Sequence, residues 1–578
     1  MMPKRWINLR LISDGWTLPA LALSAAALGA AALSIALLLR GLWLSHTAMP
    51  FWDQLEYATA DAVRGALFAR HNEHLILLPK LGFLLDLQLG GGNAFNICTI
   101  LVIQLAHALL LCWIVTVGNA EWRRPDMVAL GLALCICFSA LQYENLAWGN
   151  QTQFAGVYAL ATACFAVVFL SGTGVMATAA ACLLGAAAML TMANGVLVLP
   201  IAAGLALLAG RPWRQVLAYG LASLVLVCFF AAGHVTQGHH SSPIEALLVP
   251  WRIAIYVAVY LGKPLSEIMR FPLGADYVGL LPSIVIGGSG LLVAGALGLR
   301  AVLARRSIRP VEFVLLAGIA YIVASASVTA AGRHGFGYSQ AASPRYATPA
   351  LLFWGMLLLW LQFFAHRGGK LRALAASAML LGAASLLTLQ QPRSLFMLDQ
   401  YVASRYPAET ALIVGVRDDD AFRLVYPLPE AVESRVQGLR AARLSIFAQP
   451  YGDWIGRPLA DTLRLLPEGR CLGSFDGATL KGDGPTRFAA VNGWAWDRGQ
   501  RTRLRRLVLV NEADVIVGFA RGPVRRMDVP AGTGGAVPDT RVGWVGHALG
   551  GRGTTLRAYG LAEPGAACLI DSARRFPE

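Results

Sequence analysis

Apolar runs separated by short polar segments dominate the first two thirds of the chain. Runs of roughly 17 to 25 residues recur between Leu18 and Leu389, and each is long enough to cross a hydrocarbon core as an α-helix. The pattern predicts a polytopic α-helical membrane protein with about eleven transmembrane helices, within a range of about 10 to 13. The predicted spans are residues 18–44, 96–118, 127–142, 153–170, 175–190, 195–209, 214–233, 276–300, 311–331, 346–365 and 372–389.

The predicted loops divide into two sets by charge. Short loops rich in Lys and Arg face the cytoplasm in most membrane proteins. With these spans all five basic segments fall on one side, which predicts a bacterial inner-membrane protein with a cytoplasmic N-terminus and a periplasmic C-terminal part. The basic segments contain Lys4, Arg5 and Arg10; Arg123 and Arg124; Arg211 and Arg214; Arg305, Arg306 and Arg309; and Arg367, Lys370 and Arg372.

Residues 246–266 form one further apolar segment. Counting it as a crossing would move the basic stretch "ARRSIR" to the outer side and break the agreement among the basic loops. We therefore expect a re-entrant or interfacial segment here.

The composition supports a membrane protein rather than a nucleic-acid-binding one. The chain is 56% hydrophobic and only 14% charged, with a formal net charge of +15. A positive charge can indicate nucleic-acid binding, but the arginines lie mostly in short loops between apolar runs and in a polar tail. We interpret the basicity as a determinant of membrane orientation, and expect membrane lipids and no nucleic acid as partners.

The pattern changes after the last predicted span. Residues 391–470 are amphipathic and mixed in charge, which predicts a periplasmic helical connector. Residues 471–578 contain short alternating or β-branched runs between turn residues, the signature of an extracytoplasmic β-sandwich. Its tryptophans could bind carbohydrate, although a core role is favoured for at least two of Trp494, Trp496 and Trp544.

Two of the nine cysteines bracket this C-terminal region. Seven cysteines lie in or beside apolar runs, where the residue normally packs as a small hydrophobe. Cys471 and Cys568 do not, and a periplasmic location would be oxidising. We therefore predict a disulfide between Cys471 and Cys568.

The first predicted outer loop, residues 45–95, concentrates ionisable side chains. Asp53 and Glu56 are spaced i, i+3, so a helix would present both on one face. Two neighbouring carboxyl groups can divide the roles of base and acid, because like charges resist joint ionisation. The alternative is a solvated helix whose acids balance Arg64 and Arg70.

The same loop continues with "HNEHLILLPK", residues 71 to 80. His71 and His74 flank Glu73, and Lys80 follows. This pattern indicates a cation site or a proton relay, since imidazole titrates near neutrality and binds metals. A helix N-terminus capped by Asn72 is the structural alternative. The stretch lacks the HExxH spacing of zinc proteases.

Two later outer loops carry further polar groups. "YENLAWGNQTQ" places Glu144, Asn145 and Gln151 around a tryptophan, an arrangement that suits sugar hydroxyls and a stacked sugar face, although helix capping explains part of it. Arg333 and Arg345, the latter followed by Tyr346, lie at the outer ends of consecutive spans. Arginine binds phosphate oxygens bidentately, with snorkelling to the interface as the alternative.

Taken together, the stretches "FWDQLEY", "HNEHLILLPKLGFLLD", "ENLAWGNQTQF" and "GR...SPRY" resemble the bacterial polytopic GT-C-type glycosyltransferases over residues 1 to about 390. The resemblance implies a GT-C-like transmembrane domain that transfers a sugar from a polyprenyl-phosphate carrier to an envelope glycan or lipid on the periplasmic side. It implies Asp53 as general base, with Glu56 or Glu73 as a second acid. Arg333 and Arg345 would contact the donor phosphate. The chain lacks the paired DxD or WWD signature, which leaves the acceptor and any need for Mg²⁺ or Mn²⁺ open.

The remaining polar groups are expected to bind substrate. This set comprises His71, His74, Lys80, Glu144, Asn145, Gln151, Arg333, Arg345 and Tyr346. The alternatives to a transferase are a transporter or flippase for a lipid-linked glycan and a non-catalytic glycan-binding scaffold. A transporter would place ionisable groups near the bilayer midplane. Because these groups gather at the outer rim, the sequence favours an enzyme. Attack opposite the departing lipid phosphate would invert the anomeric centre.

Overall fold

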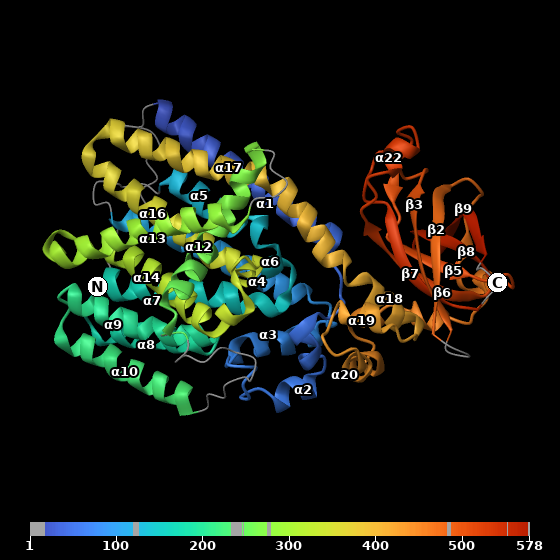
Figure 1. Cartoon of the computed structure of the whole chain (residues 1–578), viewed down its shortest axis with the longest axis horizontal. Coiled ribbons are helices and arrows are strands. Elements are labelled where there is room, and N and C mark those ends of the chain that lie inside the picture. Colours follow the sequence, from blue (N-terminus) through green and yellow to red (C-terminus); the bar gives the residue numbers. More distant parts are fainter. Residues whose placement is uncertain are drawn as a thin grey trace.

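The computed structural model describes residues 18–118, 126–232, 246, 248–273, 279–482, 487–551 and 553–575. A helical bundle forms the first part of the chain, and a separate β-sheet domain lies beyond one end of it (Figure 1). The basic residues Lys4, Arg5, Arg10, Arg123 and Arg124 lie outside the described residues, as does residue 247 of the further apolar segment 246–266.

Within the described residues, nine helical segments are long and apolar enough to cross a membrane, so the chain is a multi-pass membrane protein. The apolar helices α8 (Val175–Met189) and α9 (Val198–Leu208) are shorter and match two further predicted spans. The long segments are α1 (Leu18–Ser45), α4 (Ala94–Gly118), α5 to α6 (Met127–Ala147), η3 with α7 (Gly149–Leu170), α10 (Trp213–Ala232), α13 (Leu280–Leu303), α14 (Pro310–Arg333), α16 (Ala347–Ala365) and α17 with α18 (Lys370–Val414).

The segment predicted to be re-entrant or interfacial forms the amphipathic helix α12 (Pro250–Leu273). It is not among the nine long apolar segments of the described chain. It packs closely on α13, because Gly262 faces the Ser283 carbonyl and Gly287 faces the Ala258 carbonyl with no room for a side chain on either. Trp354 of α16 fixes its other side by donating from Nε1 to the Leu261 carbonyl at 2.9 Å.

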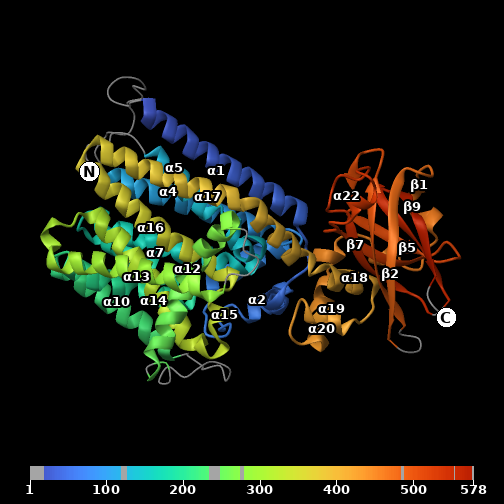
Figure 2. The same ribbon diagram turned by 45° about the horizontal axis from the view of Figure 1, so that its top comes forward.

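The two ends of the helical domain lie side by side, as α1 and α17 run together along the bundle (Figure 2). Ser34 of α1 and Thr388 of α17 form a buried hydroxyl pair at 2.9 Å. The Gln391 amide joins three elements: it donates to the carbonyls of Ser34 and Phe138 and accepts from the Ala140 backbone N–H. Such satisfied polar contacts between helices fix their relative register.

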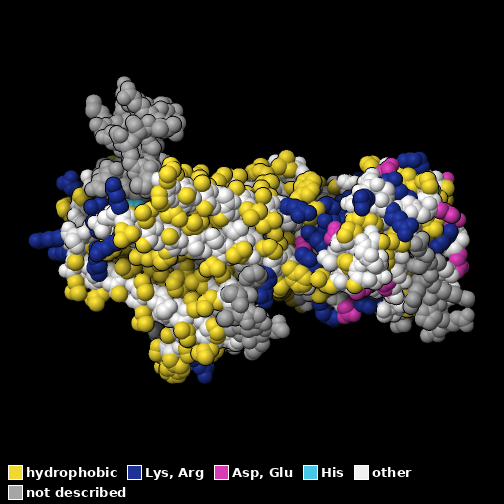
Figure 3. Space-filling model, turned by 90° about the horizontal axis from the view of Figure 1, so that it is seen from above, with side chains coloured by type: hydrophobic (Ala, Val, Ile, Leu, Met, Phe, Trp, Pro, Cys, Tyr) yellow, Lys and Arg dark blue, Asp and Glu magenta, His cyan; other side chains and the backbone are white. Residues whose placement is uncertain are grey.

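Charged side chains are distributed unevenly over the molecule. Hydrophobic side chains cover most of the helical part in Figure 3, whereas Lys and Arg gather at its far end and at its junction with the β domain. At the far end the buried Glu312 binds both Arg300 (3.0 Å) and Arg367 (3.4 Å). The acidic side chains visible on this face lie at the junction or on the β domain.

Helices occupy most of the connector between the bundle and the β domain, and α17 (Lys370–Ala403) carries the bundle as far as Ala403. The connector helices pack on the first outer loop, and the two share one apolar core that includes Leu55, Phe83, Leu412 and Phe422. They are α18 (Tyr406–Val414), α19 (Asp419–Arg423), α20 (Pro429–Ala441) and α21 (Leu459–Thr462). The loop is thus held between membrane helices and connector.

The C-terminal domain is a β-sheet domain, with Trp496 and Trp544 buried in it. Its strands hydrogen-bond in the single order β1-β9-β8-β5-β6-β7-β3-β2, with β4 beside β3, so the predicted two-sheet sandwich is not confirmed. The strands are β1 (Arg464–Leu465), β2 (Cys471–Lys481), β3 (Phe488–Asp497), β4 (Thr502–Arg503), β5 (Arg506–Val510), β6 (Ile516–Val524), β7 (Gly543–Leu549), β8 (Thr555–Glu563) and β9 (Ala566–Arg575).

A disulfide between Cys471 of β2 and Cys568 of β9 brings distant strands of this order together. The two Cα atoms are 5.7 Å apart, and the bridge joins residues 97 positions apart in the sequence. Both cysteines are buried in the core of the domain.

We expect replacement of both bridging cysteines by serine to destabilise the β domain by about 4 kcal/mol, because a cross-link over a loop of this length restricts the unfolded chain. Differential scanning calorimetry of the full-length protein in detergent measures the effect. The control is Cys98→Ser, which alters an exposed free cysteine of α4 and should leave the transition in place. Equal transition temperatures for the double variant and the wild type would contradict this expectation.

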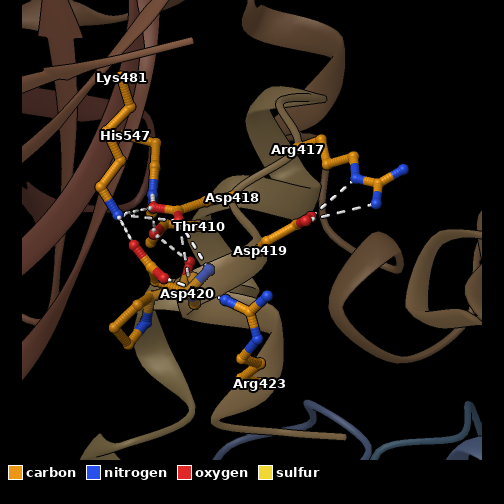
Figure 4. Close-up of polar contacts among 10 residues, drawn as sticks. Thr410, Arg417, Asp418, Asp419, Asp420, Arg423, Lys481 and His547 are labelled. Atoms are coloured by element: carbon orange, nitrogen blue, oxygen red, sulfur yellow. Dashed lines mark hydrogen bonds and ion pairs between the residues drawn. The ribbon is translucent and has the colours of Figure 1, made fainter. Parts of the chain in front are cut away.

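A buried polar cluster joins the connector to the β domain (Figure 4). His547 of β7 accepts from or donates to Thr410 at 2.8 Å and contacts Asp418 Oδ2 at 3.1 Å. Lys481 of β2 binds both oxygens of Asp418 and also Asp420. Burial opposes ionisation of Asp418, but the bonds from His547 and Lys481 hold its pKa well below the usual range. Hydrogen bonds link Thr410, His547 and Asp418 in the order found in catalytic triads. All three side chains are buried, so the cluster holds the two domains together.

Candidate functional site

A cavity of about 740 Å³ opens at the end of the helical bundle that faces the connector. We call it the outer cavity. Its walls come from the first predicted outer loop, from the segment around residues 144–154, from η4 (Ala193–Leu197), from the end of α14 and from η7 (Pro344–Tyr346), which precedes α16. The charged and amide residues of its lining are Asp53, His71, Asn72, Glu73, His74, Glu144, Asn150, Gln151, Gln153, Asn194, Arg333 and Arg345.

Asp53 and Glu56 meet at one histidine. Both lie in the 3₁₀ helix η1 (Trp52–Tyr57), where three residues make one turn and side chains at i and i+3 lie directly over each other. Asp53 Oδ2 is 3.1 Å from Nε2 of His71, and Glu56 Oε2 is 3.2 Å from its Nδ1. His71 is thus held between two carboxyl groups. Asp53 lines the outer cavity, whereas Glu56 lies behind His71 and contacts Tyr426 and Arg435.

The stretch "HNEH" forms a tight turn, so the helix-capping alternative for Asn72 is wrong. His71 and His74 exchange both backbone hydrogen bonds, at 2.8 and 2.9 Å, and the next helix, α3 (Leu77–Gln88), starts three residues later. Asn72 has φ 52°, and Trp52 beside Asp53 has φ 49°. Left-handed conformations at two non-glycine residues carry strain that the surrounding packing must sustain, and such positions cluster at functional sites.

The carboxyl groups keep His71 charged at neutral pH. Burial lowers the pKa of His71, but the hydrogen bonds that the ring donates to Asp53 and Glu56 outweigh that effect and raise the pKa to about 9. The bond to His71 is in turn the largest cause of a Glu56 pKa of about 2. The imidazolium therefore donates to Asp53 from one nitrogen and to Glu56 from the other. This arrangement orients the Asp53 carboxyl group at the cavity wall.

We expect the His71 contribution to stability to depend on pH. Because its folded-state pKa lies above the unfolded value of about 6.5, the contribution is complete below that pH and is lost as pH rises through about 9. The wild-type unfolding temperature in detergent should fall across this window more steeply than that of His71→Gln. The control His334→Gln, in η6 (His334–Phe336) directly after α14, should keep the wild-type dependence. Parallel curves for the wild type and His71→Gln would contradict the expectation.

A second group joins His74, Glu73 and Arg333. Nδ1 of His74 accepts from the Ala193 backbone N–H at 3.3 Å, so its proton resides on Nε2, which is 3.4 Å from Glu73 Oε1. Burial is the main cause that lowers the pKa of His74 to about 4, which leaves this ring neutral. Arg333 Nη2 lies 3.7 Å from the same Glu73 oxygen. Glu73 therefore links a neutral histidine to an arginine at the cavity wall.

Arg345 has a similar environment on the other side of the cavity. Its Nε is 3.6 Å from Glu144 Oε1, and Asn145 fixes its backbone by donating to the Arg345 carbonyl at 2.7 Å. Asn145 also donates to Thr348, so it positions Arg345 and is not itself part of the lining. Tyr346 lines the cavity beside Arg345 and stacks on Tyr260, with ring centroids 4.6 Å apart.

Lys80 does not reach the outer cavity, unlike the other predicted binding residues apart from Asn145. It is fully buried, and its ammonium group donates to the carbonyls of Ala66 and Ala69 at 2.7 Å each. It also lies over the Tyr57 ring, 5.4 Å from the centroid. Burial lowers its pKa to about 8. Through these bonds Lys80 holds the end of helix α2 (Ala60–Gly65) and the turn after it against α3.

Buried amides form the wall between these charged groups. Neither the amide nitrogen nor the amide oxygen of the Asn150 side chain forms a hydrogen bond within the described residues. The side-chain carbonyl oxygens of Gln151, Gln153 and Asn194 also lack a hydrogen-bond partner there. Buried polar atoms are normally satisfied. All four side chains line the outer cavity, together with the Trp148 ring. Amides beside an aromatic ring match the hydroxyls and the C–H face of a sugar.

Three cavity residues escaped the sequence interpretation: Tyr158 and Ser325 lie inside predicted spans, and Asn194 lies in the short gap between two predicted spans. Asn194 donates to Ser325 at 2.6 Å, and Tyr158 is 3.2 Å from the same hydroxyl. Arg405, which is 1% exposed, was also missed: it lies between the rings of Phe51 (4.3 Å) and Tyr401 (4.9 Å), both of which line the cavity. The polar residues within "YIVASASVTA" were the only available signal for Ser325.

In the part of the chain that the structure describes, no group of three or more His, Cys, Asp or Glu side chains is placed to hold a metal ion. Both ring nitrogens of His71 already face carboxyl oxygens. The Mg²⁺ or Mn²⁺ that the sequence left open therefore gains no specific ligand set from these residues.

Comparison with known proteins gives no family assignment. No family model matches the sequence, and no curated protein matches it.

Proposed function

We propose that the chain is an integral-membrane glycosyltransferase. In this proposal it transfers a sugar from a polyprenyl-phosphate carrier to an envelope glycan or lipid at the periplasmic face of the inner membrane. The observation that supports it best is the outer cavity, in which an oriented carboxyl group, Asp53, faces the same space as two arginines, Arg333 and Arg345. A group-transfer reaction with an anionic leaving group needs those two elements together.

The proposed reaction starts at an acceptor hydroxyl. Asp53 takes the hydroxyl proton while the acceptor oxygen bonds to the anomeric carbon, and the bond from that carbon to the phosphate oxygen breaks. The electron pair leaves with the lipid phosphate. Attack opposite the leaving group inverts the anomeric centre. His71, held by Glu56, keeps the Asp53 carboxyl group in place during proton transfer.

The arginines are suited to the departing phosphate. Arg333 and Arg345 lie 3.7 and 3.6 Å from their carboxylate neighbours, beyond ordinary hydrogen-bond length, so each can donate to a phosphate without first breaking a tight ion pair. Both belong to the ends of membrane helices, the depth at which a lipid phosphate resides. The amide groups of the cavity wall that have no hydrogen-bond partner within the described residues would bind the sugar hydroxyls.

The topology proposed with this function has eleven crossings. The nine long segments and the two shorter apolar helices supply them, with α12 as the interfacial helix. The N-terminus is then cytoplasmic, and the β domain is periplasmic, where it could bind glycan as a β-sandwich-like module. The basic groups around Glu312 would lie in the cytoplasm, at the opposite end from the outer cavity.

Reconstitution of the purified chain tests the proposal. Liposomes containing the protein receive a panel of radiolabelled polyprenyl-phosphate sugars together with a lipid extract of the native membrane. We expect one donor to be consumed, with release of the lipid phosphate and appearance of a labelled product. Movement of an intact lipid-linked sugar between leaflets, without cleavage of any donor, would instead support a flippase.

A further inference from the structure

A second cavity, of about 230 Å³, lies next to the outer cavity. Tyr260 of α12 and Tyr346 line both cavities, and their stacked rings separate them. The other walls come from α12, from the segment before α16 and from α17, which contributes Gln390, Arg393, Ser394 and Met397. The proposed transfer reaction does not use this space.

The second cavity combines unpaired polar groups with positive charge. Gln390 and Ser394 are each 3% exposed, yet Gln390 Oε1 and Ser394 Oγ have no hydrogen-bond partner within the described residues. Arg393 forms no ion pair or hydrogen bond to any described residue and is exposed. Lys263 is paired with Glu267 at 2.5 Å, so the charged lining carries a net positive charge through Arg393.

The position of Arg393 fits the lipid headgroup region. It lies 23 residues after the first residue of α17, about 35 Å along the helix at the usual rise, and a hydrocarbon core is about 30 Å thick. The Gln391 contacts to α1 and to the residues after α5 hold α17 rigidly at this level. Apolar side chains such as Met397, which is 43% exposed, continue the cavity to the surface of the helix.

We propose that the second cavity binds the phosphate headgroup of a second membrane lipid, with Arg393 and Ser394 as its ligands. This inference rests on the proposed function, because it identifies the acceptor of the proposed sugar transfer as a phosphate-bearing lipid. Arg393 supplies a charged donor that no group of the described residues occupies, and Ser394 supplies a buried hydroxyl. The lipid chain leaves the second cavity past Met397. The stacked rings of Tyr260 and Tyr346 then separate the headgroup from the outer cavity, which Asp53 lines.

Native mass spectrometry of the full chain with undecaprenyl phosphate tests the inference. The wild type should bind two lipids. Arg393→Gln should retain one, with the second weakened roughly tenfold or more through loss of a charged hydrogen bond. Ser394→Ala, which removes the hydroxyl without adding bulk, should weaken the same lipid. The matched control is Arg372→Gln, an exposed arginine at the other end of α17, which should still bind two.

The variant Arg345→Gln distinguishes this inference from the proposed function. Loss of one lipid in Arg345→Gln and of the other in Arg393→Gln supports both. Two lipids bound to Arg393→Gln, or a single wild-type lipid lost only in Arg345→Gln, overturns the second site and leaves the proposed function standing. A single lipid lost only in Arg393→Gln supports the second site and opposes the donor site. Displacement of the second lipid by millimolar inorganic phosphate would assign the cavity to free phosphate and overturn the lipid assignment.

Discussion

Asp53→Asn is expected to lower sugar transfer by about 100- to 10,000-fold, the usual contribution of a general base. The amide keeps the size of the side chain and can still contact His71, but it cannot take the acceptor proton. Transfer is measured as labelled product from the reconstituted chain with the donor that the wild type consumes. The loss should appear in kcat, because the proton moves only in the transition state.

The control for this variant is Asp61→Asn. Asp61 belongs to the same outer loop, but its side chain is 96% exposed and contacts only Arg64 among the described residues. We expect wild-type transfer from it. Both variants should keep the wild-type unfolding temperature within a few degrees at neutral pH. Wild-type transfer by Asp53→Asn would exclude this carboxyl group as the base.

Arg345→Gln is expected to lower transfer by about 100-fold, because a cation that stabilises the departing phosphate acts mainly in the transition state. Arg345→Lys should recover part of the loss, since it restores the charge without the bidentate geometry. The assay is again product formation from the labelled donor, with initial rates at several donor concentrations.

Arg306→Gln provides the matched control for Arg345. Arg306 is an exposed arginine in the loop between α13 and α14, at the opposite end of the bundle. Its replacement should leave transfer unchanged. If Arg345→Gln and Arg306→Gln gave equal rates, the departing phosphate could not depend on Arg345.

Sequence periodicity predicts the membrane helices well, because burial in lipid forces long apolar runs. It also predicts that Asp53 and Glu56 share one face. Side chains at i and i+3 lie directly over each other in the 3₁₀ helix η1, and so align even more closely than in an α-helix. It cannot show that His71 lies between them. That contact depends on the turn at Asn72, where a left-handed residue reverses the chain.

Other features depend on tertiary packing that no local pattern records. The sequence predicts that Lys80 binds substrate, yet its ammonium group donates to two backbone carbonyls instead. Ser325 is hidden in an apolar run and Asn194 lies in the short gap between two runs, and they become cavity residues only because α14 packs beside η4. In the β domain, alternation predicts strands, but their order depends on long-range pairing that a repeat of short strands leaves undetermined.

In the proposed function, Asp53 and Arg345 face one extracytoplasmic cavity that binds the sugar donor. Single cysteines at positions 53 and 345, in a background where the exposed Cys98 and Cys228 are serine, test it most directly. A membrane-impermeant maleimide added to spheroplasts should label both positions, and the polyprenyl-phosphate sugar should protect both. Labelling of the two positions from opposite sides of the membrane would contradict the account, as would labelling that the donor leaves unchanged.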